Sequence, residues 1–296
     1  MPKFIIILNP WAGRGAGRRD KARIEAALAE HGLTYDLALT DRPGDATEIA
    51  RRAADTHDVI VAAGGDGTVQ EVVNGLMQAA GGARPPTLGI VPIGSGDDFT
   101  YALGFKRHAV EEAVKRLAEN RQRAVDVGRV NGRYFVNEVA VGFAALATIE
   151  SQKVKLALGQ FVYLVGLSRA MIKYPSPRMH LRWEGGEVQD NLLMASIANG
   201  RRTGGQFLIA PTSNIADGLF DLVFAGALSR LRIGRLLPKV ARGTHLSDAA
   251  VMLRRTPWVT IEAPSGIPVH ADGEILGVDI QRLDIEILAG GVTVIA

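Results

Sequence analysis

Apolar segments that alternate with glycine-rich loops and helical patterns limit the fold of the first third of this chain most strongly. Residues 3–8 and 59–63 are apolar segments without polar alternation, a pattern typical of strands buried on both faces of a sheet. Residues 35–39 and 88–91 are further strand-like segments, with helical patterns between them. This alternation predicts an α/β fold with a doubly wound parallel sheet.

The pattern changes near residue 123, where strand-like segments replace the alternation of strand and helix. Residues 123–130 and 134–141 flank Asn131-Gly132, a dipeptide that strongly favours a two-residue hairpin. Helical patterns interrupt the later strand-like segments only at 153–172 and 231–241. The second half is therefore predicted to be β-rich and sandwich-like.

Two domains follow from these patterns. We expect an α/β domain at residues 1–125 and a β-rich domain at residues 126–284. The segment at about 285–296 is a candidate to return to the first domain. Of the 296 residues, 47% are hydrophobic and 22% are charged, which is ordinary for a globular protein.

Composition excludes several kinds of site. The chain has no cysteine, which excludes disulfides and cysteine-ligated metals. Its six histidines show no paired spacing of the kind that binds zinc. The net charge of +3 is too small to predict a nucleic-acid partner.

No segment predicts a signal peptide or a transmembrane span. The apolar run at 4–8 is short and ends in Asn9-Pro10, and the stretch at 156–167 falls well short of the ~20 residues that a span needs. We expect a cytoplasmic protein that contacts the inner membrane surface through Lys153, Lys155 and Lys173. The oligomeric state stays open, and a homodimer is compatible with the sequence.

Three glycine-rich loops, at residues 9–17, 64–68 and 94–98, follow strands of the first domain. Loops at the carboxyl ends of parallel strands line one crevice, where ligands bind. Glycines let backbone N–H groups approach phosphate oxygens, and helix N-termini add positive potential. One such loop could be a simple tight turn, but three together predict a phosphate-binding site.

Side chains in these loops suit a nucleotide with its magnesium ion. Thr68 and Ser95 can donate hydroxyl hydrogen bonds, and Asp66, Asp97 and Asp98 can bind Mg²⁺. The loops match neither a Walker A motif nor the protein-kinase signatures. The first loop has G-x-G-x-G spacing, so a Rossmann dehydrogenase, which has G-x-G-x-x-G, is an alternative with a poorer match.

In this order the loops resemble the diacylglycerol kinase catalytic domain family, and most closely its soluble bacterial lipid kinases. The resemblance extends over nearly the whole chain, and its later motifs are Asp126, residues 134–137, Gly142-Phe143, Asn199, Gly204-Gly205, Ala210-Pro211, Asp217-Gly218 and Asp272-Gly273-Glu274. Gly-Gly-Asp-Gly-Thr alone is shared with NAD kinases and phosphofructokinases, whereas the ordered set is much more specific.

The resemblance implies an ATP-dependent lipid kinase that transfers the γ-phosphate to a lipid hydroxyl, such as that of diacylglycerol, at a membrane surface. ATP and Mg²⁺ would bind the first domain, and the lipid would bind the second. The candidate nucleotide-binding residues are Asn9, Thr40, Gly64, Gly65, Asp66, Gly67, Thr68, Val69, Gln70, Gly94, Ser95 and Asp98.

The resemblance also implies catalytic and metal-binding roles. Glu274 would be the general base that accepts the proton of the lipid hydroxyl, with Asp272 and Asp66 as further catalytic candidates. Asp66 and Asp126 would lie near the catalytic Mg²⁺. A second, structural Mg²⁺ would be bound by Asn214, Asp217 and Leu219. From the residues alone, Asp272-Gly273 could also be a hairpin turn.

Three alternatives remain open at this point. The family usually has asparagine where this chain has Asp97, and the added negative charge could weaken ATP binding, as in a non-catalytic nucleotide- or lipid-binding protein. Asn137-Glu138 resembles a pair found in NAD kinases, which favours an NAD kinase-like phosphotransferase. The apolar residues proposed for a lipid groove could instead be ordinary core; they are Phe161, Tyr163, Leu164, Leu167 and Met171.

Overall fold

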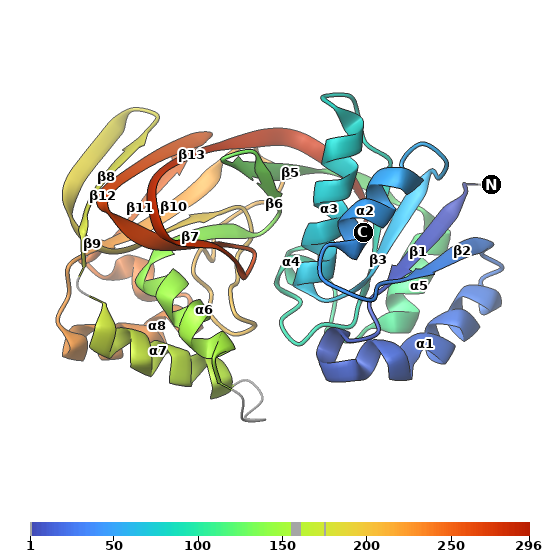
Figure 1. Cartoon of the computed structure of the whole chain (residues 1–296), viewed down its shortest axis with the longest axis horizontal. Helices are drawn as coiled ribbons and strands as arrows, with labels where there is room; N and C mark the ends of the chain where they lie inside the picture. Colours follow the sequence, from blue (N-terminus) through green and yellow to red (C-terminus); the bar gives the residue numbers. More distant parts are fainter. Residues whose placement is uncertain (1, 155–160, 175) are drawn as a thin grey trace. The chain divides into compact units, whose positions relative to one another are not determined.

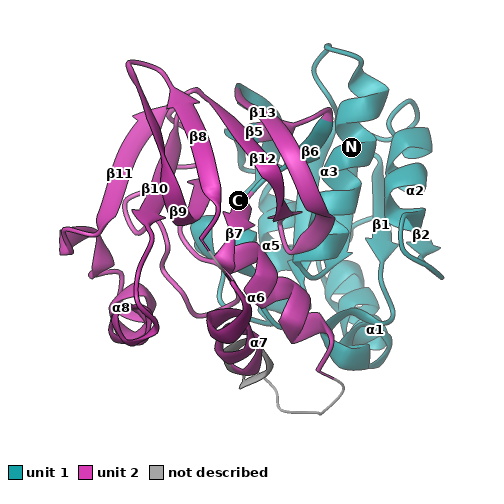
Figure 2. Ribbon diagram, turned by 60° about the vertical axis from the view of Figure 1, so that its left-hand side comes forward, with its two compact units in different colours: residues 1–127, 133–136, 288–296 teal, residues 128–132, 137–287 magenta. Residues whose placement is uncertain are grey.

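The computed structural model describes residues 2–154, 161–174 and 176–296, and the chain divides into two compact units (Figure 2). Unit 1 comprises Met1–Val127, Arg133–Val136 and Leu288–Ala296. Unit 2 comprises Gly128–Gly132 and Asn137–Ile287.

Unit 1 combines helices with a sheet whose strands run parallel. Its elements are β1 (Phe4–Leu8), α1 (Ala12–Glu30), β2 (Tyr35–Leu39), α2 (Asp45–Ala53), β3 (Val59–Gly64), α3 (Asp66–Ala80), β4 (Thr87–Pro92), α4 (Asp98–Ala102) and α5 (Val110–Glu119). Strand β1 pairs in parallel with β2 and β3, and β3 pairs in parallel with β4. The predicted α/β character of the first half is confirmed (Figure 1).

The helices of unit 1 pack against one another in pairs and against the apolar strands of the sheet. Helix α2 packs against α3, and α1 packs against α5. A Cβ atom on Gly75 of α3 would lie 2.3 Å from the carbonyl oxygen of Thr47 in α2, so only glycine permits this close approach. Strands β1 and β3 are buried along their whole length, as their sequences predict.

Unit 2 is built mainly from antiparallel strands. The elements of the second half are β5 (Gln122–Val130), β6 (Arg133–Phe135), β7 (Glu138–Gly142), α6 (Phe143–Gln152), α7 (Phe161–Lys173), β8 (Arg178–Trp183), β9 (Gly186–Ala198), β10 (Phe220–Gly226), α8 (Arg230–Arg242), a 3₁₀ turn (His245–Ser247), β11 (Val251–Thr256), β12 (Trp258–Ala271) and β13 (Glu274–Ile295). The strand order is β11-β10-β9-β7-β12-β13. The predicted β-rich second half is confirmed.

Long strands in unit 2 take different partners at their two ends. Residues 186–191 of β9 pair with β8, whereas residues 194–198 pair with β7. Likewise, residues 259–262 of β12 pair with β8, and residues 269–271 pair with β7. This change of partner lets one set of strands form both faces of a sandwich-like body.

Two strands contribute residues to both units. Strand β5 leaves unit 1 after Val127, and β13 enters unit 1 at Leu288. Within unit 1, Val294 of β13 pairs in parallel with Leu88 of β4. The last strand therefore adds an edge to the sheet of the first unit.

The structure corrects one helix and confirms one turn. The helix expected over 153–172 is α7, which begins at Phe161, and residues 155–160 lie outside the described part of the chain. Helix α6 precedes it and was not predicted, because its apolar sequence directly continues that of β7. Asn131-Gly132 forms the expected hairpin turn between β5 and β6, with φ angles of 45° and 84°.

Candidate functional site

The three glycine-rich loops of unit 1 lie together at the carboxyl ends of the parallel strands. The side chain of Asn9, which follows β1, donates from Nδ2 to Thr68 Oγ1 over 3.1 Å. The backbone N–H of Ile93, which follows β4, donates to the carbonyl oxygen of Gly64 over 2.9 Å. The predicted convergence of these loops is confirmed.

Glycines permit the close contacts between these loops. A Cβ atom on Gly13 would lie 2.2 Å from the carbonyl oxygen of Ile93. A Cβ atom on Gly65 would lie 3.0 Å from the Cα of Gly94. The backbones of separate loops therefore touch where a side chain would keep them apart.

The first loop contains three successive left-handed residues. Gly13, Arg14 and Gly15 have φ angles of 55°, 59° and 84°, so the regular part of α1 begins only after them. Trp11, just before, is right-handed. Such changes of handedness within a turn are typical of backbone concavities that bind anions.

Asp66 connects the second loop to the third. Its Oδ1 accepts hydrogen bonds from the backbone N–H groups of Asp98, at 2.7 Å, and Phe99, at 3.2 Å. This carboxylate therefore caps the N-terminus of α4. In addition to any role toward a ligand, Asp66 holds two of the three loops in place.

Two carboxylates face the bare Cα of Gly96. A Cβ atom there would lie 2.8 Å from Oδ2 of Asp66 and 3.6 Å from Oδ2 of Asp98. Magnesium is commonly bound by one or two carboxylates together with substrate phosphates. This pair of oxygen donors fits a catalytic Mg²⁺, although the described residues contain no group of three or more His, Asp or Glu side chains that could hold a metal without further ligands.

The remaining nucleotide-binding candidates differ in exposure. Ser95 is exposed, and Thr40 is buried at the same strand edge, where its backbone N–H donates to the carbonyl oxygen of Leu8. The side chains of Val69 and Gln70 are buried. Among the described residues, no group accepts a hydrogen bond from Nε2 of Gln70.

Asp126 is buried on β5. Its Oδ1 accepts a hydrogen bond from the backbone N–H of Gly290, at 2.7 Å. This contact joins β5 to the returning strand β13. The structure thus gives Asp126 a role in holding unit 1 together.

In unit 2, Glu274 follows a two-residue hairpin turn. Asp272 and Gly273 have φ angles of 49° and 86°, and Ala271 of β12 pairs with Glu274 of β13. The turn geometry that the sequence allowed for Asp272-Gly273 is therefore present. Glu274 is half-buried at the start of β13.

Several groups hold this hairpin in place. Asp272 Oδ1 accepts hydrogen bonds from the backbone N–H groups of Asn137, at 2.9 Å, and Glu138, at 2.8 Å. Gln152 at the end of α6 donates from Nε2 to the carbonyl oxygen of Gly273 over 3.1 Å. His270 Nδ1 accepts from the backbone N–H of Gly273 over 3.3 Å. Sequence reasoning missed Gln152 and His270, because no motif marks a residue that only supports a turn.

Burial changes the protonation of two groups beneath the hairpin. It lowers the pKa of His270 to about 4, so the imidazole is neutral and its Nδ1 can accept a hydrogen bond. Burial raises the pKa of Glu138, whose Oε2 accepts a hydrogen bond from Ser196 Oγ. The carbonyl oxygen of Glu138 accepts from the backbone N–H of Asp272. The Asn137-Glu138 pair therefore supports the hairpin from within.

At the second metal site expected from the sequence, the side chains of Asp217 and Asn214 have protein partners. Asp217 Oδ1 accepts from the backbone N–H of Leu219, and its Oδ2 accepts from the guanidinium of Arg255. Arg255 also lies 3.4 Å from Oδ1 of the buried Asp221. Asn214 Oδ1 accepts from the backbone N–H of Ala216. The guanidinium of Arg255 thus lies beside both carboxylates, and a structural Mg²⁺ bound by Asn214, Asp217 and Leu219 stays a prediction.

The residues expected to line a lipid groove are only partly described. Leu167 is buried in a core cluster with Phe143 and Leu193, and Met171 packs against that cluster. For these two residues the core interpretation holds. Residues 155–160 lie outside the described part of the chain, as do the side chains of Phe161, Tyr163 and Leu164.

Two of the three lysines expected at a membrane surface share one carboxylate, and the third, Lys155, lies outside the described residues. Lys153 and Lys173 both donate to Oε1 of Glu150, at 2.9 Å and 3.1 Å. They also line a cavity of about 420 Å³ whose other walls include Leu146 and Ile149. In the described part of the chain, no helix has both the length and the apolar character to cross a membrane.

Comparison with known proteins supports the same class of enzyme. The diacylglycerol kinase catalytic domain model matches residues 3–130, and the YegS C-terminal NAD kinase beta sandwich-like domain model matches residues 137–296. A diacylglycerol kinase of Bacillus subtilis is 31% identical over 94% of this chain and 91% of its own length. A probable lipid kinase YegS-like protein of Chromohalobacter salexigens is 34% identical over 91% of this chain and 86% of its own length.

A solved structure shares the fold. The crystal structure of a diacylglycerol kinase from Bacillus anthracis superposes with a TM-score of 0.76 and 24% identity, and the match covers 99% of this chain and 96% of that one. The matched catalytic domain and the diacylglycerol kinase and lipid kinase relatives define a phosphotransferase with an alcohol acceptor. The chain belongs to the diacylglycerol kinase family, among its lipid kinases.

Proposed function

We propose that this protein is an ATP-dependent lipid kinase that transfers the γ-phosphate of ATP to a lipid hydroxyl such as that of diacylglycerol. The convergence of the three glycine-rich loops in unit 1 carries this proposal. Backbone N–H groups of these loops and the N-terminus of α3 would bind the phosphates. Asn9, Thr68 and the exposed Ser95 would add side-chain hydrogen bonds.

Asp66 and Asp98 are the carboxylates that would hold Mg²⁺ beside these loops, and Asp126 remains a candidate for the same ion. Bound Mg²⁺ would neutralise charge on the phosphates during transfer. Asp66 also keeps the second and third loops in register through its bonds to the N-terminus of α4. Replacing Asp66 would therefore affect both metal binding and loop geometry.

Glu274 would act as the general base that accepts the proton of the acceptor hydroxyl. Its position depends on the turn before it, which Asp272 fixes to the start of β7. We therefore propose Asp272 as a positioning residue for this base. The cavity lined by Lys153 and Lys173 is the candidate entrance for the acceptor, since it combines apolar walls with positive charge.

The base assignment is tested by Glu274→Gln, with Glu184→Gln in an exposed turn of unit 2 as the matched control. We expect the first variant to lose at least about 100-fold in kcat, which is the scale of general-base catalysis. ATP affinity should stay within about twofold, because Glu274 does not belong to the loops of unit 1. Activity of Glu274→Gln near that of the control would refute the assignment.

The acceptor is tested by supplying ATP-Mg with diacylglycerol in mixed micelles or with NAD, and following labelled phosphate. Label on the lipid supports the proposal. Label on NAD would instead support an NAD kinase-like phosphotransferase, whose sandwich-like domain is named in the family model that matches residues 137–296. ATP binding without transfer to any member of a panel of lipid alcohols would indicate a non-catalytic binding protein.

A further inference from the structure

Helix α8 carries an unusual concentration of positive charge. Its 13 residues contain four arginines, one lysine and no acidic residue. The whole chain has a net charge of only +3. The surface of α8 is therefore strongly positive on a protein that is close to neutral overall.

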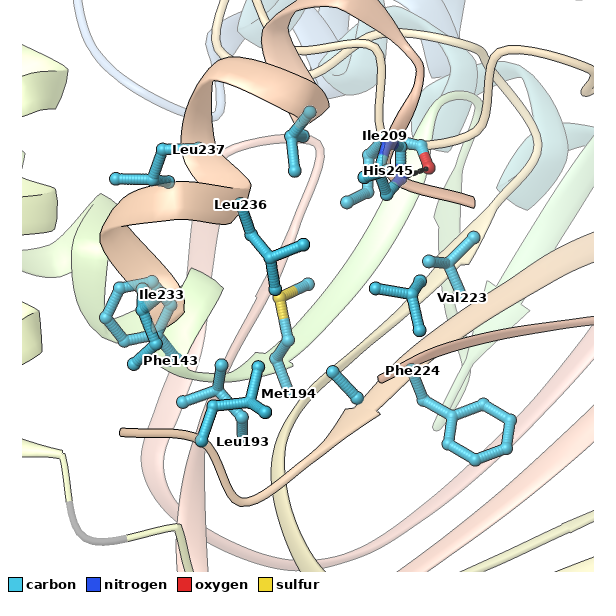
Figure 3. Close-up of a pocket in the computed structure, with 14 residues that line it drawn as sticks. Phe143, Leu193, Met194, Ile209, Val223, Phe224, Ile233, Leu236, Leu237 and His245 are labelled. Carbon is cyan, nitrogen blue, oxygen red and sulfur yellow. Dashed lines mark hydrogen bonds between the residues drawn. The ribbon is translucent and has the colours of Figure 1, made fainter. Parts of the chain in front are cut away.

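The apolar face of α8 is already covered by unit 2. Leu236 points toward Met194 of β9, Ile233 lies beside Phe143, and both line an apolar cavity of about 60 Å³ together with Leu237 (Figure 3). Ile233 and Leu236 are buried. The fold thus fixes α8 with its opposite face toward solvent.

That outer face carries exposed arginines and one exposed leucine, next to the small exposed residues Gly234, Pro238 and Ala241. Arg235 and Arg242 are exposed and form no ion pair within the described part of the chain. Arg232 and Lys239, at the border of this face, both contact Asp248. Leu231 lies four residues before Arg235, hence on the same side of the helix, and is 66% exposed.

The end of α7 adds a second exposed aliphatic side chain. Arg230 donates from its guanidinium to the carbonyl oxygen of Ile172 over 3.0 Å, which places the start of α8 beside the end of α7. Ile172 is 68% exposed. A cavity of about 270 Å³, lined by Met171, Leu228 and Arg230 among others, lies between these two helix ends.

We infer that the surface formed by Arg230, Leu231, Arg235, Arg242 and Ile172 binds the surface of an anionic phospholipid bilayer. Arginines with protruding aliphatic side chains suit a layer of anionic headgroups above acyl chains. A nucleic-acid backbone would offer the exposed leucine and isoleucine side chains no apolar environment. These side chains therefore favour a bilayer over a nucleic acid as the partner of this surface. The inference does not depend on which alcohol is phosphorylated, and it identifies a different surface from the one expected around Lys153.

The test measures binding of the full chain to vesicles by co-sedimentation. Vesicles of phosphatidylcholine alone are compared with vesicles that also contain phosphatidylglycerol. The variants are Arg235→Gln/Arg242→Gln and Leu231→Ser. The matched control, Lys106→Gln/Lys115→Gln, removes two positive charges from unit 1.

We expect the wild-type protein and the control to bind the anionic vesicles, and the double arginine variant to bind about tenfold or more weakly. Leu231→Ser should lower binding severalfold without changing net charge. Transfer to a lipid alcohol in detergent micelles should stay unchanged in all variants. Absence of transfer by the wild-type protein, together with intact vesicle binding, would count against the proposed function rather than against this surface.

Two outcomes would overturn the inference. In the first, both arginine substitutions leave binding to anionic vesicles at the level of the control. In the second, the wild-type protein binds double-stranded DNA as tightly as the anionic vesicles, with the same dependence on Arg235 and Arg242. The second outcome would identify a general polyanion surface.

Discussion

Single residues in the third loop are constrained by backbone conformation as much as by chemistry. Asp97 is buried and has a φ of 52°. Among residues other than glycine, asparagine and aspartate adopt this left-handed conformation most readily. The aspartate that departs from the asparagine usual in the family therefore preserves the turn, and only its charge is new.

The substitution Asp97→Asn removes this charge and keeps a residue that adopts the same backbone conformation. We expect stability to change by less than about 1 kcal/mol, because asparagine suits the same conformation. ATP affinity should rise, since a negative charge beside the phosphate-binding loops is removed. Isothermal titration with ATP-Mg and thermal unfolding measure the two effects. Weaker ATP binding in the variant would show that the Asp97 carboxylate contributes favourably.

The lowered pKa of His270 predicts that the free energy of unfolding depends on pH. Above its ordinary pKa of 6.5 the imidazole is neutral in the folded and unfolded states and has no effect. Below pH 6.5 the unfolded chain gains a proton that the folded protein excludes until about pH 4, so the free energy of unfolding falls as pH falls. His270→Gln, which retains a hydrogen-bond acceptor for Gly273, should reduce this loss by about 2 kcal/mol at pH 5.

Urea unfolding of both proteins at pH 7 and pH 5 provides the measurement. His245, whose pKa burial also lowers, and Glu138, whose pKa burial raises, are present in both proteins, so their contributions cancel in the comparison. Equal pH slopes for the wild type and the variant would mean that His270 is protonated in the folded protein.

At the scale of elements, the loops depend on glycines that no other residue replaces. Gly13→Ala would place a Cβ atom 2.2 Å from the carbonyl oxygen of Ile93, in a left-handed conformation. Gly32→Ala is the matched control, because Gly32 is also left-handed but has nothing within 4 Å of its Cβ position. We expect both to lose about 1 kcal/mol from backbone strain, and only Gly13→Ala to lose further stability from this clash together with ATP binding. If both variants bind ATP like the wild type, the first loop does not contact the nucleotide.

Arg255 joins β11 to the segment before β10. Arg255→Gln should leave Asp217 close to the buried Asp221 without a cation, which costs about 1 to 2 kcal/mol of stability. Millimolar Mg²⁺ should restore part of this loss in the variant. If Arg255 alone neutralises these carboxylates, the melting temperature of the nucleotide-free wild type should be insensitive to chelators. A large drop on chelation would support the second metal site expected from the sequence.

Local patterns in the sequence predicted much of the fold, but neither helix α6 nor the contacts between side chains far apart in the sequence. The apolar runs of β1 and β3 and the Asn131-Gly132 turn follow from short-range physics, and all three are present. Helix α6 was missed because an apolar helix that directly follows an apolar strand has no periodic signal of its own. Arg255 could not be paired with Asp217 from sequence, because 38 positions separate them.

At the scale of the whole chain, the family resemblance supplied what local patterns could not. The loops of the first unit predicted a phosphate-binding site from residue chemistry alone. The role proposed for Glu274 came only from the resemblance, since an Asp-Gly turn by itself predicts a hairpin. The contacts of Gln152 and His270 with that hairpin emerged only from the folded chain.

The return of β13 to the first unit has a consequence for synthesis on the ribosome. Strand β4 receives its outer neighbour only from residues near Val294, which emerge more than 200 positions after Leu88. Until then the nascent chain exposes an apolar strand edge, a known template for aggregation. The first unit therefore keeps this edge of β4 open until the residues around Val294 have been synthesised.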